Sequence, residues 1–377
     1  MSEKIVAVDV FPVSCVLPRP VGDGQGLQPK REETFVRVTS SSGAYGWGEG
    51  GPPVPGAWLL SRVVGPALIG LSPFDCDLLH DRIARSRAPR SSIGAVDIAL
   101  WDLRGKLTGQ SVASLLGGAR RDRVLAYASL HNYSESVDCS DEFAALLTDA
   151  KQRGFRALKM KIGGRSPEED IRYIKLAREV GGDDFGLMAD ANQTYSVPLA
   201  VRIGRVLEDE AYAWFEEPIA RTNLPGYAEL RAKLDIAIAG GEGATSAADI
   251  QLILAMRGAD IVQPDVAGVG GLSESRFIPR LASLWGASPT WHVWNSPLIQ
   301  VATLHVLANQ EPWHPHSMLP QMAPLEVTTM PSPMRERLLI GAPTIEPDGT
   351  MRVPTSPGLG VDVDMAVLKE FALDGIV

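Results

Sequence analysis

The middle of the chain, residues 126–330, alternates between two hydrophobic patterns. Short, mostly apolar runs recur there, among them ALKMKI, FGLMAD, YAWFE and ADIVQP. Between them lie stretches whose apolar residues repeat every three or four positions, such as PEEDIRYIKLAREVG and VPLAVRIGRVLEDE. The short runs are typical of buried strands, and the longer repeat is typical of amphipathic helices. Because strands that alternate with helices form parallel sheets, this pattern predicts a series of βα units.

The regions on either side have other patterns. Residues 1–125 predict an α+β unit, with strands at IVAVDVFPV and TFVRVTSS joined by a loop rich in proline and glycine at residues 18–31. A helix is expected from Ser91, with apolar residues at helical spacing, and it should end at Gly109. Residues 331–377 are rich in proline and glycine and finish in a short helix, MAVLKEFAL. We therefore expect three regions: 1–125, 126–330 and 331–377.

Six polar residues recur through the βα region, each at or just after the end of an apolar run. They are Lys161, Asp190, Glu216, Glu242, Asp265 and His292, separated by 29, 26, 26, 23 and 27 residues. A βα unit occupies about 25 to 35 residues, so this spacing gives one polar residue per strand end. Eight such units close into a barrel whose strand ends face one pocket. The spacing therefore predicts that these residues meet in a single active site.

Four of the six residues are acids, and the first three of these lie on successive strands, namely Asp190, Glu216 and Glu242. Carboxylates that share a pocket repel one another unless a cation lies among them. Ligands that are all oxygen favour a hard ion, Mg²⁺ first and Mn²⁺ as a substitute. The alternative is that each acid caps the helix after it. The matched spacing favours a metal site, with Asn192 and Glu217 beside it.

Two lysines precede the acids. Lys159 and Lys161 are two residues apart on one predicted strand, so both should point into the barrel. Their mutual repulsion should lower the pKa of one of them, which would make a neutral amine available as a base. The alternative is a solvated pair on an outer strand.

A histidine follows the acids. His292 lies among aromatic and apolar residues, WHVW, where a histidine is often only a packed core residue. Asp265 ends the preceding βα unit, and neighbouring strand ends would bring its carboxylate to the imidazole. Such a pair orients the ring and raises its pKa, as a general acid and base requires.

Composition and charge exclude several other classes of protein. The 377 residues have a net charge of −9, which argues against nucleic acid as a partner. We expect no membrane span because no apolar run approaches 18 residues. The first residues, MSEKIVAVDVFPVSC, do not resemble a signal peptide, and three scattered cysteines suit a reducing compartment. The cytoplasm is therefore the expected location.

The motifs KMK, DAN, FEEP, GGE, QPD and HVW, in this order, resemble the enolase superfamily and its mandelate racemase and muconate lactonizing enzyme subgroup. YGWGEG, DIALWDLRGK and PTSPGLGVDVD resemble other parts of the same family, so the resemblance covers essentially the whole chain. It implies a (β/α)7β TIM-like barrel. The N-terminal region and the C-terminal segment would form an α+β capping domain, with residues 19–31 over the pocket.

The resemblance also implies roles for individual residues. Asp190, Glu216 and Glu242 match the metal ligands of the family. Lys161 matches a base on one face of the substrate, with Lys159 as its neighbour. His292, paired with Asp265, matches the acid and base on the opposite face. Glu326, in PLEV, matches a glutamate near the substrate carboxylate.

The expected activity is Mg²⁺-dependent removal of the proton α to a carboxylate, through an enediolate intermediate. We expect an acid-sugar dehydratase, acting on a small-molecule carboxylate such as an acid sugar or its lactone. The alternatives are a racemase, an epimerase or a sugar-lactone cycloisomerase with the same intermediate, and, more remotely, a non-catalytic sugar-acid binding protein. We also expect a homo-oligomer.

Overall fold

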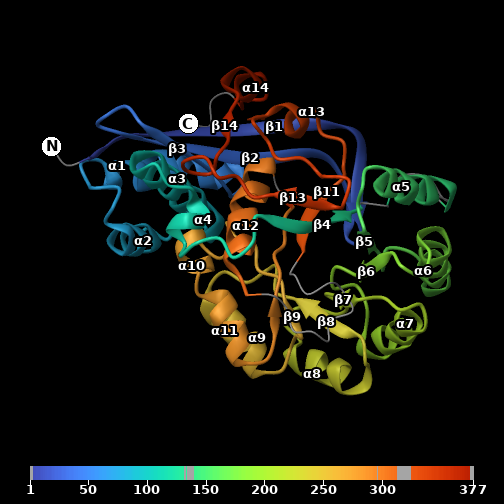
Figure 1. Cartoon of the computed structure of the whole chain (residues 1–377). Helices are drawn as coiled ribbons and strands as arrows, with labels where there is room; N and C mark the ends of the chain where they lie inside the picture. Colours follow the sequence, from blue (N-terminus) through green and yellow to red (C-terminus); the bar gives the residue numbers. More distant parts are fainter. Residues whose placement is uncertain (1–2, 131–132, 134–139, 295, 312–323, 374–377) are drawn as a thin grey trace.

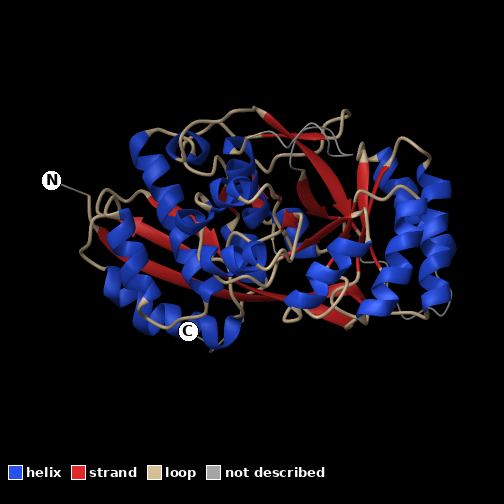
Figure 2. Ribbon diagram, turned by 90° about the horizontal axis from the view of Figure 1, so that it is seen from below, coloured by secondary structure: helices blue, strands red, loops and turns tan. Residues whose placement is uncertain are grey.

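The computed structural model describes residues 3–130, 133, 140–294, 296–311 and 324–373 (Figure 1). The chain is an α/β protein whose parallel barrel lies beside an antiparallel sheet and helices from the N-terminal region (Figures 1 and 2). No helix among the described residues has both the length and the apolar character that a membrane crossing requires.

Eight parallel strands form the barrel. In chain order they are β4 (Arg123–Ser129), β5 (Ala157–Lys161), β6 (Gly186–Asp190), β7 (Trp214–Glu216), β8 (Ala237–Gly240), β9 (Ile261–Val262), β10 (Ser288–Pro289) and β11 (Leu325–Thr328). Each strand pairs with the next from β4 to β10, and β11 pairs with β4. The ring closes where Trp291, just after β10, bridges Leu325 of β11. The barrel is therefore closed, as the βα pattern predicted.

Helices cover the outside of the barrel between successive strands. They are α5 (Ser140–Gln152), α6 (Pro167–Gly181), α7 (Val197–Asp209), α8 (Leu224–Lys233), α9 (Ala247–Ala255), α10 (Leu272–Ser275), α11 (Ile278–Leu284) and α12 (Pro297–Asn309). Local sequence explains where they begin. Ser166, for example, caps α6 and forms a capping box with Glu169. Seven crossovers and a final strand give the (β/α)7β order expected from the family resemblance.

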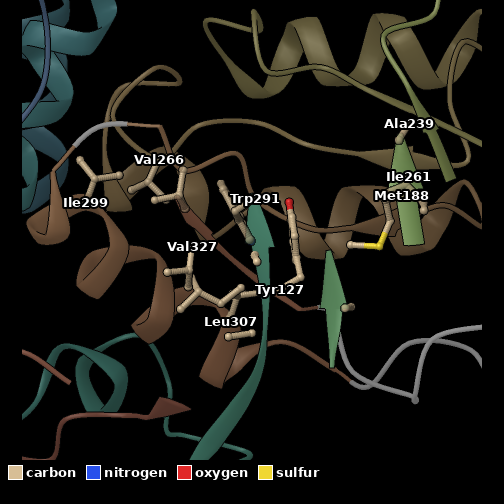
Figure 3. Packing of buried hydrophobic residues seen from close by; sticks show 14 of the residues in the cluster. Tyr127, Met188, Ala239, Ile261, Val266, Trp291, Ile299, Leu307 and Val327 are labelled. Atoms are coloured by element: carbon tan, nitrogen blue, oxygen red, sulfur yellow. The ribbon is translucent and has the colours of Figure 1, made fainter. Parts of the chain in front are cut away.

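Aromatic side chains fill the barrel interior. Tyr127 on β4 and Trp214 on β7 are fully buried, and their rings meet edge to face with centroids 5.6 Å apart. Tyr127 and Trp291 belong to the large hydrophobic cluster of which Figure 3 shows a part. The packed interior confines polar chemistry to the end of the barrel at which the strands finish.

The N-terminal region forms an antiparallel sheet of β1 (Ile5–Asp23), β2 (Gly26–Ser40) and β3 (Tyr45–Glu49). The loop predicted for residues 18–31 is wrong, because β1 and β2 continue through it to a turn at Gly24 and Gln25. Its prolines suggested a loop. Pro18 and Pro20 lie in the edge strand β1 at a register shift between Val16 and Val21, and Pro29 lies in a part of β2 that β3 does not reach, so a missing N–H is tolerated at each. Figure 1 shows this long hairpin running across the barrel.

Helical elements follow the sheet: η1 (Pro53–Ala57), η2 (Leu60–Val64), α1 (Gly65–Leu68), α2 (Cys76–Ala84), α3 (Arg90–Thr108) and α4 (Val112–Leu115). As predicted, α3 ends just before Gly109, which caps the helix with a φ of 68°. Two glycines of β3 let α3 approach closely. A Cβ atom at Gly46 or Gly48 would lie 2.1 or 1.9 Å from a carbonyl oxygen of α3.

The C-terminal residues contact both other regions. They form α13 (Pro333–Arg337), β12 (Leu339–Ile340), β13 (Thr350–Arg352), β14 (Asp362–Val363) and α14 (Met365–Glu370). β13 pairs with β4 of the barrel, whereas Asp362 accepts hydrogen bonds from Tyr45 and Trp47 of β3. This segment therefore joins the barrel to the N-terminal sheet. The boundaries of the three predicted regions stay a prediction.

Candidate active site

The first three acids of the polar series, Asp190, Glu216 and Glu242, lie together. Asp190 ends β6, Glu216 ends β7, and Glu242 lies two residues beyond β8. One carboxylate oxygen from each lies within 4.8 Å of the other two. Three oxygen donors at this separation fit a hard divalent cation, so the triad can hold a metal ion. The carboxylates come from adjacent strands, which explains their convergence.

Further groups orient these carboxylates. Asp190 accepts a hydrogen bond of 2.9 Å from the backbone N–H of Asn192. Glu216 accepts one of 2.7 Å from the side chain of Gln263. Glu242 lies 3.2 Å from the guanidinium of Arg221, which also contacts Glu217 at 3.1 Å. Each acid therefore has a partner that fixes one of its oxygens.

The backbone beside the triad has an unusual conformation. Asn192 and Glu217 have φ values of 41° and 36°, in the left-handed region that non-glycine residues rarely adopt. Both follow the ends of ligand strands, and both are buried. Strained positions of this kind cluster at functional sites. Burial and the nearby Glu242 raise the pKa of Glu217 to about 9.

The two lysines point to the same end of the barrel and are buried. The Nζ atom of Lys161 lies 2.5 Å from Asp190 Oδ2. The Nζ atom of Lys159 lies 2.8 Å from both Glu216 Oε1 and Glu326 Oε1. They are therefore not the solvated outer pair that was the alternative.

The expected direction of the lysine pKa shift is wrong for the protein's own side chains. Burial lowers the pKa of Lys161, but Asp190 and the other nearby carboxylates outweigh both burial and the repulsion from Lys159, so the net shift is upward. The pKa of Lys159 is also raised, because Glu216 and Glu326 outweigh its burial. The spacing of the two lysines on one strand does not reveal the acids of neighbouring strands, which determine the sign of the shift.

His292 and Asp265 lie side by side. The imidazole Nδ1 is 3.1 Å from Asp265 Oδ2, and Nε2 is 3.5 Å from Glu242 Oε2. Burial lowers the pKa of His292, but Glu242 and Asp265 outweigh it and raise that pKa to about 9. The ring is thus oriented through one nitrogen while the other faces the triad. This arrangement suits an acid or base better than a packed core histidine.

Glu326 lies on β11, next to the lysine pair and His292. One of its oxygens contacts Lys159, and the other accepts a hydrogen bond of 2.9 Å from the N–H of Val293. Burial raises the pKa of Glu326, but Lys159 and His292 outweigh it and lower that pKa to about 2. The structure therefore brings together all eight residues singled out in the sequence: Lys159, Lys161, Asp190, Glu216, Glu242, Asp265, His292 and Glu326.

Sequence reasoning missed three polar residues around this site. Gln263 bonds to Glu216, and Arg221 bridges Glu217 and Glu242. Glu49, at the end of β3, accepts hydrogen bonds from the backbone of Ser296 and Ile299 at the start of α12. Gln263 lies within the QPD motif, where its place before Asp265 was a usable signal. Nothing local in the sequence marks the partners of Arg221 or Glu49.

The hairpin of β1 and β2 reaches the mouth of this pocket. The side chain of Gln25, at its turn, donates a hydrogen bond of 2.7 Å to the carbonyl oxygen of Asn192. Gly22 bridges Tyr133, which follows β4. The turn of the segment expected to cover the pocket is therefore a paired hairpin in contact with the residues after β4 and β6. Its role as a cover over the pocket stays a prediction.

A closed βα barrel with a carboxylate triad, buried lysines and an Asp–His pair at the ends of its strands is the architecture of a metal-assisted barrel enzyme. Two family models agree with this class. Residues 7–117 match the mandelate racemase / muconate lactonizing enzyme N-terminal domain, and residues 142–367 match the enolase C-terminal domain-like family. The chain belongs to the enolase superfamily, in its mandelate racemase and muconate lactonizing enzyme subgroup, and is an enzyme.

Individual relatives span nearly the whole chain. D-galactarolactone cycloisomerase from Agrobacterium fabrum is 33% identical, over 98% of this chain and 99% of its own length. The crystal structure of the 3,6-anhydro-D-galactonate cycloisomerase from Zobellia galactanivorans has a TM-score of 0.86 and 30% identity, with 98% and 100% of the chains covered. L-talarate/galactarate dehydratase from Salmonella typhimurium LT2, liganded with Mg and L-lyxarohydroxamate, has a TM-score of 0.85 and 26% identity, with 99% and 94% covered.

Proposed function

We propose that this enzyme removes the proton α to the carboxylate of an acid sugar or its lactone, with Mg²⁺ as its metal. The observation that most supports this is one pocket that places a carboxylate triad between Lys161 and His292. Asp190 and Glu242 raise the pKa of these two groups, and a cation held by the same carboxylates would offset that charge and let the amine or the imidazole accept a proton. The names of the relatives agree with the proposal, since they act on sugar acids or their lactones as dehydratases or cycloisomerases.

Asp190, Glu216 and Glu242 would hold the metal ion, and Mn²⁺ could replace Mg²⁺ because both prefer oxygen ligands. When bound, this ion would supply the positive charge that offsets the second negative charge that develops on the substrate carboxylate. Gln263 keeps Glu216 directed to the centre of the triad, and Arg221 does the same for Glu242.

Lys161 and His292 approach the pocket from different parts of the ring. Lys161 ends β5 and His292 follows β10, and the strands of the triad lie between them along one side of the barrel. Each would therefore face a different side of the α-carbon. One accepts the α-proton, at Lys161 Nζ or His292 Nε2, according to the configuration of the substrate.

Dehydration is the first outcome that we propose. After one base has removed the α-proton, protonated His292 is placed to give a proton to the β-hydroxyl, which leaves as water. The resulting enol becomes a 2-keto acid. Asp265 stabilises the imidazolium and fixes its orientation through Nδ1. Lys159 is held by Glu216 and Glu326, so we assign it to charge balance rather than to proton transfer.

Lactone isomerisation is the second candidate, favoured by the 33% identity with D-galactarolactone cycloisomerase over nearly both full lengths. In that reaction the group lost from the β-carbon is the carboxylate of the lactone ring instead of water, so the ring opens.

The experiment that separates these outcomes is a screen of sugar acids and their lactones with semicarbazide as a trap. A dehydratase converts an open-chain sugar acid into a 2-keto acid, and semicarbazide traps that product as a semicarbazone. A cycloisomerase consumes only lactones. The proposed function would be contradicted if the folded, Mg²⁺-loaded protein turned over none of the acids or lactones.

A further inference from the structure

A small buried cavity lies between the N-terminal hairpin, the barrel and the C-terminal segment. Its lining includes Arg31, Glu33, Trp294, Ser296, Thr328 and Arg335. Its volume is about 10 Å³, which is room for about one water molecule or one oxygen atom of a ligand. None of these residues belongs to the triad or to the proposed acid–base groups.

The cavity adjoins the far end of the candidate active site. Thr328 is two residues beyond Glu326 on β11, so both side chains point to the same face of the strand. That step is about 7 Å at the usual rise of a strand. Trp294 is likewise two residues beyond His292. A ligand whose reactive end lies at the triad and His292 would therefore reach the cavity with its other end.

Three polar atoms at this cavity are buried without a hydrogen-bond partner. They are a terminal nitrogen of Arg31, Oε2 of Glu33 and the hydroxyl of Thr328. Arg31 is only 8% exposed, and its guanidinium stacks 3.3 Å from the centre of the Trp294 ring. An unpaired buried polar group costs about 1–3 kcal/mol, and more if it is charged. Three together indicate that the cavity receives a polar partner.

The charges around the cavity favour an anion. Both guanidinium groups, those of Arg31 and Arg335, line it. Glu49 is engaged elsewhere, with Ser296 and the start of α12, and Arg335 donates to Gln300 at 2.5 Å. Glu33 lies close enough to attract Arg31, although its Oε2 accepts no hydrogen bond. Arg31 therefore forms no ion pair with an acid among the described residues, and Glu33 offsets its charge only from a longer distance.

We propose that Arg31 and Thr328 bind the second carboxylate of a dicarboxylic sugar acid, at the end opposite the reacting carbon. The inference rests on the proposed function and narrows its substrate class. One carboxylate oxygen would occupy the cavity and accept hydrogen bonds from the guanidinium and the Thr328 hydroxyl, while Glu33 would accept one from an adjacent sugar hydroxyl. A monocarboxylic acid ends in an uncharged hydroxymethyl group, which would leave Arg31 without its anion.

The test compares a hexaric acid with the hexonic acid of the same configuration. We expect Arg31→Met to lower kcat/KM for α-deuterium exchange of the hexaric acid about 10- to 100-fold, mainly through KM, since a hydrogen bond to a charged group is lost. The value for the hexonic acid should stay within about twofold, so that the preference for the diacid disappears. Lys30→Met is the matched control, because Lys30 is an exposed neighbour on the same strand and should leave both values unchanged.

Two further variants keep the test decisive if Arg31→Met does not fold. Valine has nearly the same shape as threonine, so Thr328→Val should weaken binding of the hexaric acid only. Arg31→Lys should have the same effect, because lysine lacks the planar guanidinium group that binds a carboxylate through two hydrogen bonds. Calorimetric titration with each acid in the presence of Mg²⁺ measures the same preference without turnover. An unchanged ratio of the two acids in the folded variants, by kinetics and by calorimetry, would overturn the subsite. A different outcome separates the two proposals. If the unaltered protein binds the diacid but exchanges no α-proton, and the variants lose that binding, the subsite is supported and the proposed function is contradicted.

Discussion

At the residue scale, side chains from different strands determine the properties of each active-site group. Lys159 and Lys161 are alike in sequence, two apart on β5, and both were predicted to face the barrel lumen. The structure separates them, because Lys159 lies between Glu216 and Glu326, whereas Lys161 contacts Asp190. Spacing along one strand predicts the shared face. This spacing does not show which acid of another strand each lysine contacts, although those contacts determine the sign of the lysine pKa shift.

The positions of Lys161 and His292 predict that each acts on one configuration of the α-carbon. Lys161→Ala should reduce exchange of an α-proton of one configuration by about 10² to 10⁴, and His292→Asn should do so for the other. Asp265→Asn should resemble His292→Asn more weakly, since Asp265 only orients and stabilises the ring. Deuterium incorporation into both epimers by each variant is the measurement. If one variant loses both activities and the other keeps both, the two-sided site is wrong.

Gln263 predicts a second effect at this scale, on metal affinity. Gln263→Leu removes the donor that holds Glu216, at 2.7 Å, and should weaken Mg²⁺ binding about 10- to 100-fold. Calorimetric Mg²⁺ titration measures this directly, with Gln152→Leu at the exposed end of α5 as the control. Equal Mg²⁺ affinity in Gln263→Leu and the unaltered enzyme would show that Gln263 does not position the ligand.

At the scale of single elements, periodicity located the barrel strands, and helical spacing followed by Gly109 located α3. The loop predicted for residues 18–31 from their prolines and glycines was wrong, because the chain forms a hairpin there. The reason is tertiary, because β1 is an edge strand and the turn of the hairpin contacts the loop after β6. Contacts of this kind join segments more than 150 residues apart, which no local pattern reveals.

Glu49 supplies a prediction for α12. Both of its oxygens accept hydrogen bonds at the N-terminus of that helix, from Ser296, Ile299 and the Ser296 hydroxyl. Glu49→Gln would turn an amide N–H₂ towards one of these donors and should lower the free energy of unfolding by about 1–3 kcal/mol. Denaturant unfolding measures the change, and the exposed Glu32→Gln serves as control. A change equal to that of the control would mean that Glu49 does not hold the helix.

At the scale of the whole molecule, the order of patterns predicted a parallel βα barrel, and the even spacing predicted the convergence of the polar residues. The family resemblance supplied the (β/α)7β order. Closure of the ring joins Trp291 to Leu325, and the C-terminal segment pairs β13 with β4 across more than 200 residues. The resemblance to the family, and not the local pattern, supplied the expectation that this segment completes the barrel and cap. The expected homo-oligomer and the boundaries of the three regions stay predictions.

The central claim is that the assembled pocket removes a proton α to a carboxylate with the help of a metal ion held by Asp190, Glu216 and Glu242. Loss of the α-proton signal of sugar acids in D₂O, followed by proton NMR, tests it most directly. We expect exchange with Mg²⁺, loss of exchange after EDTA treatment, and recovery on adding Mg²⁺ but poor recovery with Zn²⁺. Exchange that continues at full rate after exhaustive chelation would contradict the account, as would an absence of exchange with every sugar acid that the Mg²⁺-loaded enzyme binds.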